Sequence, residues 1–408
     1  MDSEAGGTVR RQFASAVPSL RRHAGWLAAA LLGAWLPAHA APPAHQFDYS
    51  WTQFASYPSS DDVDARFYYG GKFEFIARID GERAALWRGL TINLHAEGVY
   101  GENTSASGAP MLLPPNAAMT FPVNNAEAAD LAINFTQKIG KASLTFGKIN
   151  MLEKAAGTPL LGGGGLEGFQ HVGLAATPSL LTPPTIFGAL LSVPVDRTVV
   201  TFGAWDTKSA VRKTGLESPF DEGVAAMVSV MLPMKPNGLS GYHTFSVSAN
   251  NKEGLNLRDI PDLFLPPEAE AVVGNKQGAW HVKYTVQQFL RQDASGRGWG
   301  VFGHVGVWDA NPSSMQWVAA LGVTGQPVHG PRPDDRFGIG YFRASYSDHL
   351  RRGLQPILEI RDEQGIEVFY TWQVGRHLRL TADAQVIDSG IAVADRLVVV
   401  GLRARLGR

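Results

Sequence analysis

The chain has 408 residues, enough for two soluble domains or one large barrel. Its formal net charge is −1, from 36 basic and 37 acidic residues, so it lacks the basic footprint of a nucleic-acid-binding protein. It contains no cysteine, which excludes a disulfide framework and a thiolate nucleophile.

The N-terminal residues predict a signal peptide, residues 1–40. Arg21 and Arg22 precede the apolar run 26–36, and Ala38-His39-Ala40 supplies a small-x-small cleavage pattern. The apolar run is too short to cross a membrane as a helix, and no later window is long and apolar enough. If the mature protein lies in a membrane, it must therefore form a closed β-barrel, because only helices and barrels satisfy the backbone in lipid.

Residues 41–65 are polar and contain proline and serine, so we interpret them as an N-terminal lead-in segment. The barrel domain is predicted to cover residues 66–408. Its first two strands, 69–79 and 90–98, carry charged residues on one face only. Long loops are expected at 101–127 and at the glycine-rich stretch 151–168.

Further alternating segments follow along the chain. They lie at 129–138, 142–150, 169–176, 184–194, 197–206, 222–232, 239–250, 278–289, 297–309, 314–325, 336–347, 366–374, 378–386 and 398–406.

The last of these segments show the pattern most clearly. Leu378, Leu380 and Ala382 alternate with Arg379 and Thr381. Successive side chains on a strand point to opposite faces, so such a segment has one apolar and one polar face. Runs of about 9–11 residues are long enough for a tilted strand to cross a bilayer. The fold class predicted is thus an all-β, transmembrane antiparallel barrel of about 16 strands, with short periplasmic turns and longer extracellular loops.

The motifs that would carry chemistry are weak. Residues 163–168 fit G-x-G-x-x-G, but the run lies in a loop and not between a buried strand and a helix, so no nucleotide site is predicted. The histidines lack metal-ligand spacing. No G-x-S-x-G motif is present. We therefore predict no cofactor, no metal and no catalytic residue, although an outer-membrane enzyme such as a lipase and a soluble sugar-binding β-sandwich remain alternatives.

The polar face of the strands is the remaining candidate site, because a charge facing lipid costs a few kcal/mol at mid-depth. Trp205, Trp308 and Phe369 could offer stacking faces to a sugar ring. The charged and imidazole side chains predicted to face the lumen and line the solute path are Lys72, Glu74, Arg78, His95, Glu97, His281, Lys283, Arg379, Asp383, Arg403 and Arg405.

Three segments resemble the carbohydrate-selective porins of the Gram-negative outer membrane (OprB-like). They are 80–97, DGERAALWRGLTINLHAE; 146–150, FGKIN; and 365–387, GIEVFYTWQVGRHLRLTADAQVI. The resemblance implies a sixteen-stranded outer-membrane barrel with a constricted channel for glucose and related sugars. A general diffusion porin is the close alternative. Family members usually end in an aromatic residue that the barrel-assembly machinery reads, whereas this chain ends Leu406-Gly407-Arg408.

The expected partners are sugars as transported solutes, outer-membrane lipid and the barrel-assembly machinery; a monomer and a homotrimer both remain open. One contact is also predicted from closure of the barrel. Pairing of the first and last strands is expected to bring Lys72, Glu74 and Arg78 near Arg403 and Arg405, forming a positive strip on the lumen wall.

Overall fold

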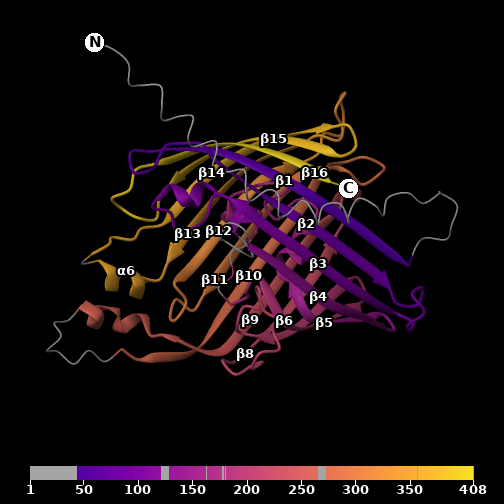
Figure 1. Ribbon diagram of the computed structural model, residues 1–408, viewed down its shortest axis with the longest axis horizontal. Helices are drawn as coiled ribbons and strands as arrows, with labels where there is room; N and C mark the ends of the chain where they lie inside the picture. Colours follow the sequence, from indigo (N-terminus) through magenta and orange to yellow (C-terminus); the bar gives the residue numbers. More distant parts are fainter. Residues whose placement is uncertain are drawn as a thin grey trace, which may run out of the picture. The chain divides into compact units, whose positions relative to one another are not determined.

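The computed structural model describes residues 44–120, 128–161, 163–176, 179, 181–264, 273–355 and 357–407. Within these ranges sixteen antiparallel strands form one closed barrel, in which sequence neighbours pair and β1 pairs with β16 (Figure 1). The predicted fold class is therefore confirmed. The predicted signal peptide lies outside the described residues.

The strands follow one another around the barrel in sequence order. They are β1 (His45–Ser59), β2 (Tyr68–Asp80), β3 (Leu90–Gly101), β4 (Ala128–Ile139), β5 (Ala142–Asn150), β6 (Thr185–Val195), β7 (Thr198–Asp206), β8 (Val224–Met234), β9 (Gly241–Leu255), β10 (Asn275–Gln292), β11 (Gly298–Trp308), β12 (Met315–Gly325), β13 (Arg336–Tyr346), β14 (Glu363–Val374), β15 (Leu378–Asp388) and β16 (Leu397–Gly407).

Strand β1 closes the barrel, so the interpretation of 41–65 as a lead-in segment is wrong for residues 45–59. The outer face of β1 carries Phe47, Tyr49 and Trp51, which are 52%, 43% and 50% exposed. Its inner face carries small polar residues such as Ser50 and Thr52. The sequence did not predict this strand because its serines and proline give it the composition of a loop, although aromatic and polar side chains alternate along it.

The segment 169–176 is not a strand, which is a second correction. It contains the short helix α5 (Val172–Ala175), whose four residues are all buried inside the barrel. A Cβ atom on Gly173 would lie 2.7 Å from the Phe342 ring, so this helix packs closely against β13. The residues of this helix are apolar because the helix is buried on all sides, not because they form one face of a strand. The predicted number of strands was right only because this error offset the omission of β1.

The two faces of the strands differ as the alternation predicts. On β14, Ile366 and Val368 are 48% and 47% exposed on the outer surface, whereas Glu363 and Glu367 are fully buried on the inner one. An apolar outer band with polar groups inside is the arrangement that a barrel needs in lipid.

Short and long connections alternate around the barrel. Residues 140–141 and 375–377 form tight turns, in which Gly140 and Gly375 adopt φ of 60° and 67°. The connections 102–127 and 151–184 are long. By analogy with outer-membrane barrels, we assign the short turns to the periplasmic end and the long loops to the extracellular end.

The long loops carry most of the helical segments. These are η1 (Thr104–Ser107), α3 (Ala117–Thr120), α4 (Met151–Ala156), α5, η3 (Leu257–Phe264) and α6 (Asp348–Leu354), whereas η2 (Pro236–Gly238) lies in the short connection between β8 and β9. None of the helices in the described ranges is long and apolar enough to cross a membrane.

The main apolar core lies inside the barrel. Leu113, Leu160 and Leu174 from the loops 102–127 and 151–184 pack against inner-wall residues such as Phe302 and Phe342. These loops therefore fill part of the lumen.

Candidate functional site

The loop between β5 and β6, residues 151–184, folds into the barrel and is held there by polar side chains of the wall. Gln287 of β10 accepts hydrogen bonds through Oε1 from the backbone N–H groups of Leu160 (2.7 Å) and Leu161 (3.1 Å). All three residues are buried. Buried backbone N–H groups need partners, and here a side chain far away in the sequence supplies them.

Two further wall residues hold the same loop. Glu367 accepts from the N–H groups of Gln170 (2.5 Å) and His171 (2.9 Å). Arg403 donates to the carbonyl oxygens of Gly165 (2.6 Å) and Gly168 (3.0 Å). The glycine-rich run is thus a loop, as predicted, and the structure shows that it is tightly turned, with φ of 106° at Gly163.

His171 begins helix α5, and its imidazole is fully buried. The ring stacks on Phe342 at 4.0 Å, and its Nδ1 accepts a hydrogen bond from Gly173 N (3.1 Å). Burial lowers the pKa of His171 to about 3, so the ring is neutral at physiological pH.

The loop between β3 and β4 is anchored in the same way. Glu363 accepts hydrogen bonds from the N–H groups of Leu112 (2.8 Å) and Leu113 (2.7 Å). Both inward loops therefore depend on carboxylates that β14 places on the inner wall, and together they narrow the lumen.

Charged side chains of β2 and β3 also meet the inward loop. Lys72 Nζ lies 2.6 Å from Glu97 Oε2, and the two side chains are only 4% and 2% exposed. His95 lies 3.5 Å from Glu74 and 3.3 Å from Glu153 of α4. Burial alone would raise the pKa of Glu153, but the adjacent His95 imidazole and the nearby positive charges hold it below its usual value.

Glu74, His95 and Glu97 lie close enough together to hold a metal ion. However, the Lys72 ammonium already lies against Glu97 and supplies the positive charge that these carboxylates need. This arrangement favours an ion-pair network over a metal centre.

The charged side chains that remain accessible lie nearer the periplasmic end than the buried pair of Lys72 and Glu97. The side chain of Arg78 is 42% exposed and lies 3.1 Å from Asp48 and 3.4 Å from Glu153. On β15 and β16, Arg379 and Arg405 both pair with Glu167 of the inward loop, and their side chains stay 40% and 22% exposed.

Glu167 lies beside four arginines. Burial raises the pKa of Glu167, but the charges of Arg405 and Arg379, with smaller contributions from Arg336 and Arg403, lower it below its usual value overall. The inner wall thus presents exposed guanidinium groups alternating with carboxylates, which are hydrogen-bond donors and acceptors for hydroxyl groups.

The comparisons with known proteins agree with this geometry. The sequence profile of the family described as "Carbohydrate-selective porin, OprB family" matches residues 65–406. The chain belongs to the carbohydrate-selective porin family. It is a substrate-selective channel of the outer-membrane type.

Solved porins share the fold. The high-pH structure of Pseudomonas putida OprB matches with a TM-score of 0.77 and 16% identity, covering 90% of this chain and 94% of that one. The low-pH structure of the same protein matches with a TM-score of 0.50 and 13% identity, covering 90% and 93%. At these identities the likeness shows the fold alone. No curated protein matches the sequence.

In this porin the predicted lumen residues fall into groups. Arg78, Arg379 and Arg405 remain accessible, and Glu74 is 13% exposed. The members of the set that are buried in contacts with other residues are Lys72, His95, Glu97, Asp383 and Arg403. The remaining two, His281 and Lys283, lie together on the inner face of β10.

The predicted positive strip is not continuous. Strand β1 lies between β2 and β16, and its residue Thr52 pairs with both Lys72 and Arg405. The prediction took β2 for the first strand, so it placed the charges one strand too close. Arg403 is 2% exposed and hydrogen-bonded to the loop, so it anchors the loop and cannot contact a solute directly in this conformation.

The prediction that three aromatic side chains offer stacking faces to a sugar ring is also wrong. Trp205 is fully buried, and Trp308 and Phe369 are each only 2% exposed, because apolar clusters and the inward loops cover them. Phe369 meets the loop residue Phe169 edge-on, with ring centroids 5.0 Å apart.

Several residues that anchor the inward loop or pair with charges of the wall were not predicted from the sequence. Glu153 and Glu167 lie on the inward loop, where no periodicity marks them. Glu367 already stood on the polar face of a predicted strand, so the alternation could have identified it. Gln287 lies on a predicted strand but is neutral, and its role appears only through its contact with the loop.

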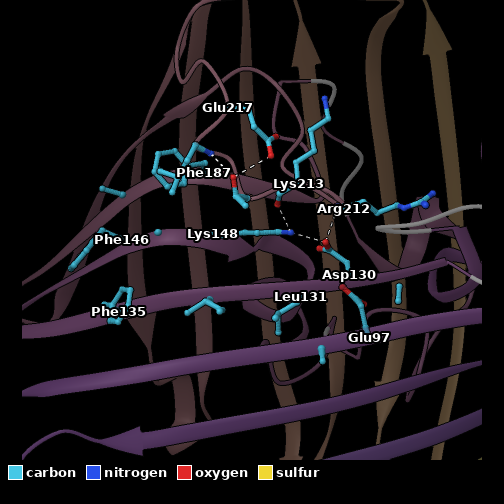
Figure 2. A pocket seen from close by; sticks show the side chains of 18 of the residues that line it. Glu97, Asp130, Leu131, Phe135, Phe146, Lys148, Phe187, Arg212, Lys213 and Glu217 are labelled. Atoms are coloured by element: carbon cyan, nitrogen blue, oxygen red, sulfur yellow. Dashed lines mark hydrogen bonds and ion pairs between the residues drawn. The ribbon is translucent and has the colours of Figure 1, made fainter. Parts of the chain in front are cut away.

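A separate cavity of about 1360 Å³ lies in the outer wall where β4 and β5 diverge (Figure 2). The ladder between these strands ends at Asn134 and Gly147. Beyond it, Lys148 Nζ lies 2.6 Å from Asp130 Oδ1 and bridges the gap.

This cavity has an apolar side and a polar end. Leu131 and Phe146, both exposed on the outer face, line it together with Phe135 and Phe187. The loop between β7 and β8 closes the polar end, where Lys213 O accepts a hydrogen bond from Lys148 Nζ (2.8 Å). We therefore assign the cavity to the lipid-facing surface and not to the solute path.

Proposed function

We propose that the protein is a passive channel for neutral sugars, glucose and related hexoses, which acts without catalysis, metal or cofactor. The observation that carries this proposal is the set of accessible arginines, Arg78, Arg379 and Arg405, each paired with a carboxylate from β1 or the inward loop. Guanidinium groups are directional donors and carboxylates are acceptors, so together they match the hydroxyl groups of a sugar. The signs of the charges nearly balance, which disfavours selection for one ion.

The inward loops favour a selective channel over a general diffusion porin. Wall residues from β10, β14 and β16 fix the backbone of the loop 151–184 at three places. A loop held by several buried hydrogen bonds keeps a defined constriction, and selectivity requires such a shape.

We also propose the route by which the protein reaches its site. Residues 1–40 direct export and are removed, and the barrel-assembly machinery inserts the barrel into outer-membrane lipid. The barrel works either alone or as a homotrimer; size measurement in detergent distinguishes these states.

Liposome swelling tests the proposal. Purified protein in liposomes should admit glucose faster than sorbitol, an open-chain polyol of similar size, whereas a general porin should admit both at rates set by size alone. Equal rates would contradict selective passage.

An esterase assay tests the enzyme alternative. Hydrolysis of acyl esters by the pure protein, abolished by replacing one serine, would favour that alternative.

A further inference from the structure

Lys283 lies on the inner wall of the barrel, on β10. Its neighbours in register on β9 and β11 are Ser246 and Gly306, so small residues flank it on both sides. The side chain is half-buried. Among the residues that the structure describes, Lys283 makes no ion pair. An ammonium group that is partly desolvated and uncompensated is costly, so this position favours an anion.

Two aromatic side chains converge beside this lysine. A Cβ atom on Gly306 would lie 2.9 Å from His281 Nε2 and 2.9 Å from the Trp308 ring, so both rings lie over the glycine that pairs with Lys283. The rings stack on each other with centroids 4.2 Å apart and planes at 9°. The absence of a side chain at position 306 lets the two rings approach the wall at this point.

The polar atoms around Lys283 also lack partners. His281 Nε2, Trp308 Nε1 and both ring nitrogens of His304 are buried and make no hydrogen bond within the described part of the chain. His281 and His304 are each 4% exposed, and both lie within electrostatic reach of the Lys283 ammonium. Buried polar groups are normally hydrogen-bonded, so several unpaired groups at one place indicate a site for a ligand.

We propose that Lys283 binds the carboxylate of an acidic sugar; Lys283 and the buried rings of His281, His304 and Trp308 behind it are here called the β10–β11 group. The half-buried ammonium supplies the charge and the contact with the solute, and the buried rings form the uncharged wall against which it lies. This inference rests on the proposed function and extends it, because it adds sugar acids to the solutes of the channel.

The position of the β10–β11 group fits a site met before the constriction. Strand β10 begins after the long loop following β9, and Lys283 precedes Gln287, which holds the inward loop. With the long loops at the extracellular end, a solute reaches Lys283 before it reaches the loop.

Single-channel recording in planar bilayers tests this site, with gluconate, glucose and acetate as probes. In the unaltered protein, gluconate should block the ion current at lower concentration than glucose does, and acetate should not block. In Lys283→Met, which keeps the length of the side chain, the concentration of gluconate that halves the current should rise about tenfold or more, as expected for loss of a charge-assisted bond. Glucose block should stay unchanged.

Two variants serve as controls. Lys283→Arg keeps the charge and should retain gluconate block, and Lys138→Met, which removes an exposed lysine near the tight turn at 140–141, should leave it unaltered. Unchanged gluconate block in Lys283→Met, or equal block by acetate, would overturn the proposal. Block by glucose without block by gluconate would also overturn it while leaving the proposed function intact, whereas block by neither sugar would count against both.

Discussion

Replacement of Gln287 by leucine should release the inward loop and widen the channel. The substitution preserves the approximate size of a buried side chain but removes the acceptor that Gln287 gives to the Leu160 and Leu161 N–H groups. Each buried donor left without a partner costs about 1–3 kcal/mol, so the pair costs about 2–6 kcal/mol. A loss near 3 kcal/mol raises the ratio of released to packed loop by roughly a hundredfold.

Single-channel recording should detect this release. The Gln287→Leu variant is expected to show larger and more variable conductance, together with weaker block by glucose. Gln287→Glu should behave like the unaltered protein, because a carboxylate can accept both hydrogen bonds. A folded Gln287→Leu barrel with unchanged conductance and glucose block would refute the anchoring role of this side chain.

Three further predictions concern the path, the loop and the wall. Arg78→Ala and Arg405→Ala should each weaken glucose block by several-fold and shift ion selectivity toward cations; unchanged values in both variants would remove these arginines from the solute path. Because burial holds the pKa of His171 at about 3, below its ordinary value near 6.5, the packed loop should keep its full stability above pH 6.5 and lose stability as the pH falls toward 3. Conductance should become noisier over that range in the unaltered protein and less so in His171→Asn; identical pH profiles would contradict this. Lys148→Met leaves a buried carboxylate unpaired and should lower barrel stability by about 3–5 kcal/mol in denaturant titration. Lys252→Met, which breaks an exposed ion pair, should lower it by about 0.2–1 kcal/mol, and equal effects would argue against the bridging role.

The barrel was predictable because its signal is local. A strand in a lipid-facing wall must alternate apolar and polar residues, and 365–387 shows that alternation without any knowledge of its partners. The same reasoning failed at 45–59, where aromatic residues alone mark the outer face. It also failed at 169–176, where burial inside the barrel made a helix look like an alternating strand.

The constriction was not predictable, because it depends on contacts between distant residues. Glu367 binds the backbone at Gln170, 197 positions earlier in the chain. Backbone N–H groups carry no sequence signature, so nothing in the residue types at 160–171 indicates that they bind the wall. The missed strand β1 also displaced the expected neighbours of Arg405 by one strand.

The most direct test of sugar-selective passage is the ion current through single channels of the unaltered protein as glucose is added. The accessible arginine–carboxylate pairs and the anchored loops predict a current that falls with glucose concentration and saturates, because glucose occupies a defined site in the constriction. A large current that glucose leaves unchanged, apart from the effect of viscosity, would contradict the account and identify a general diffusion pore.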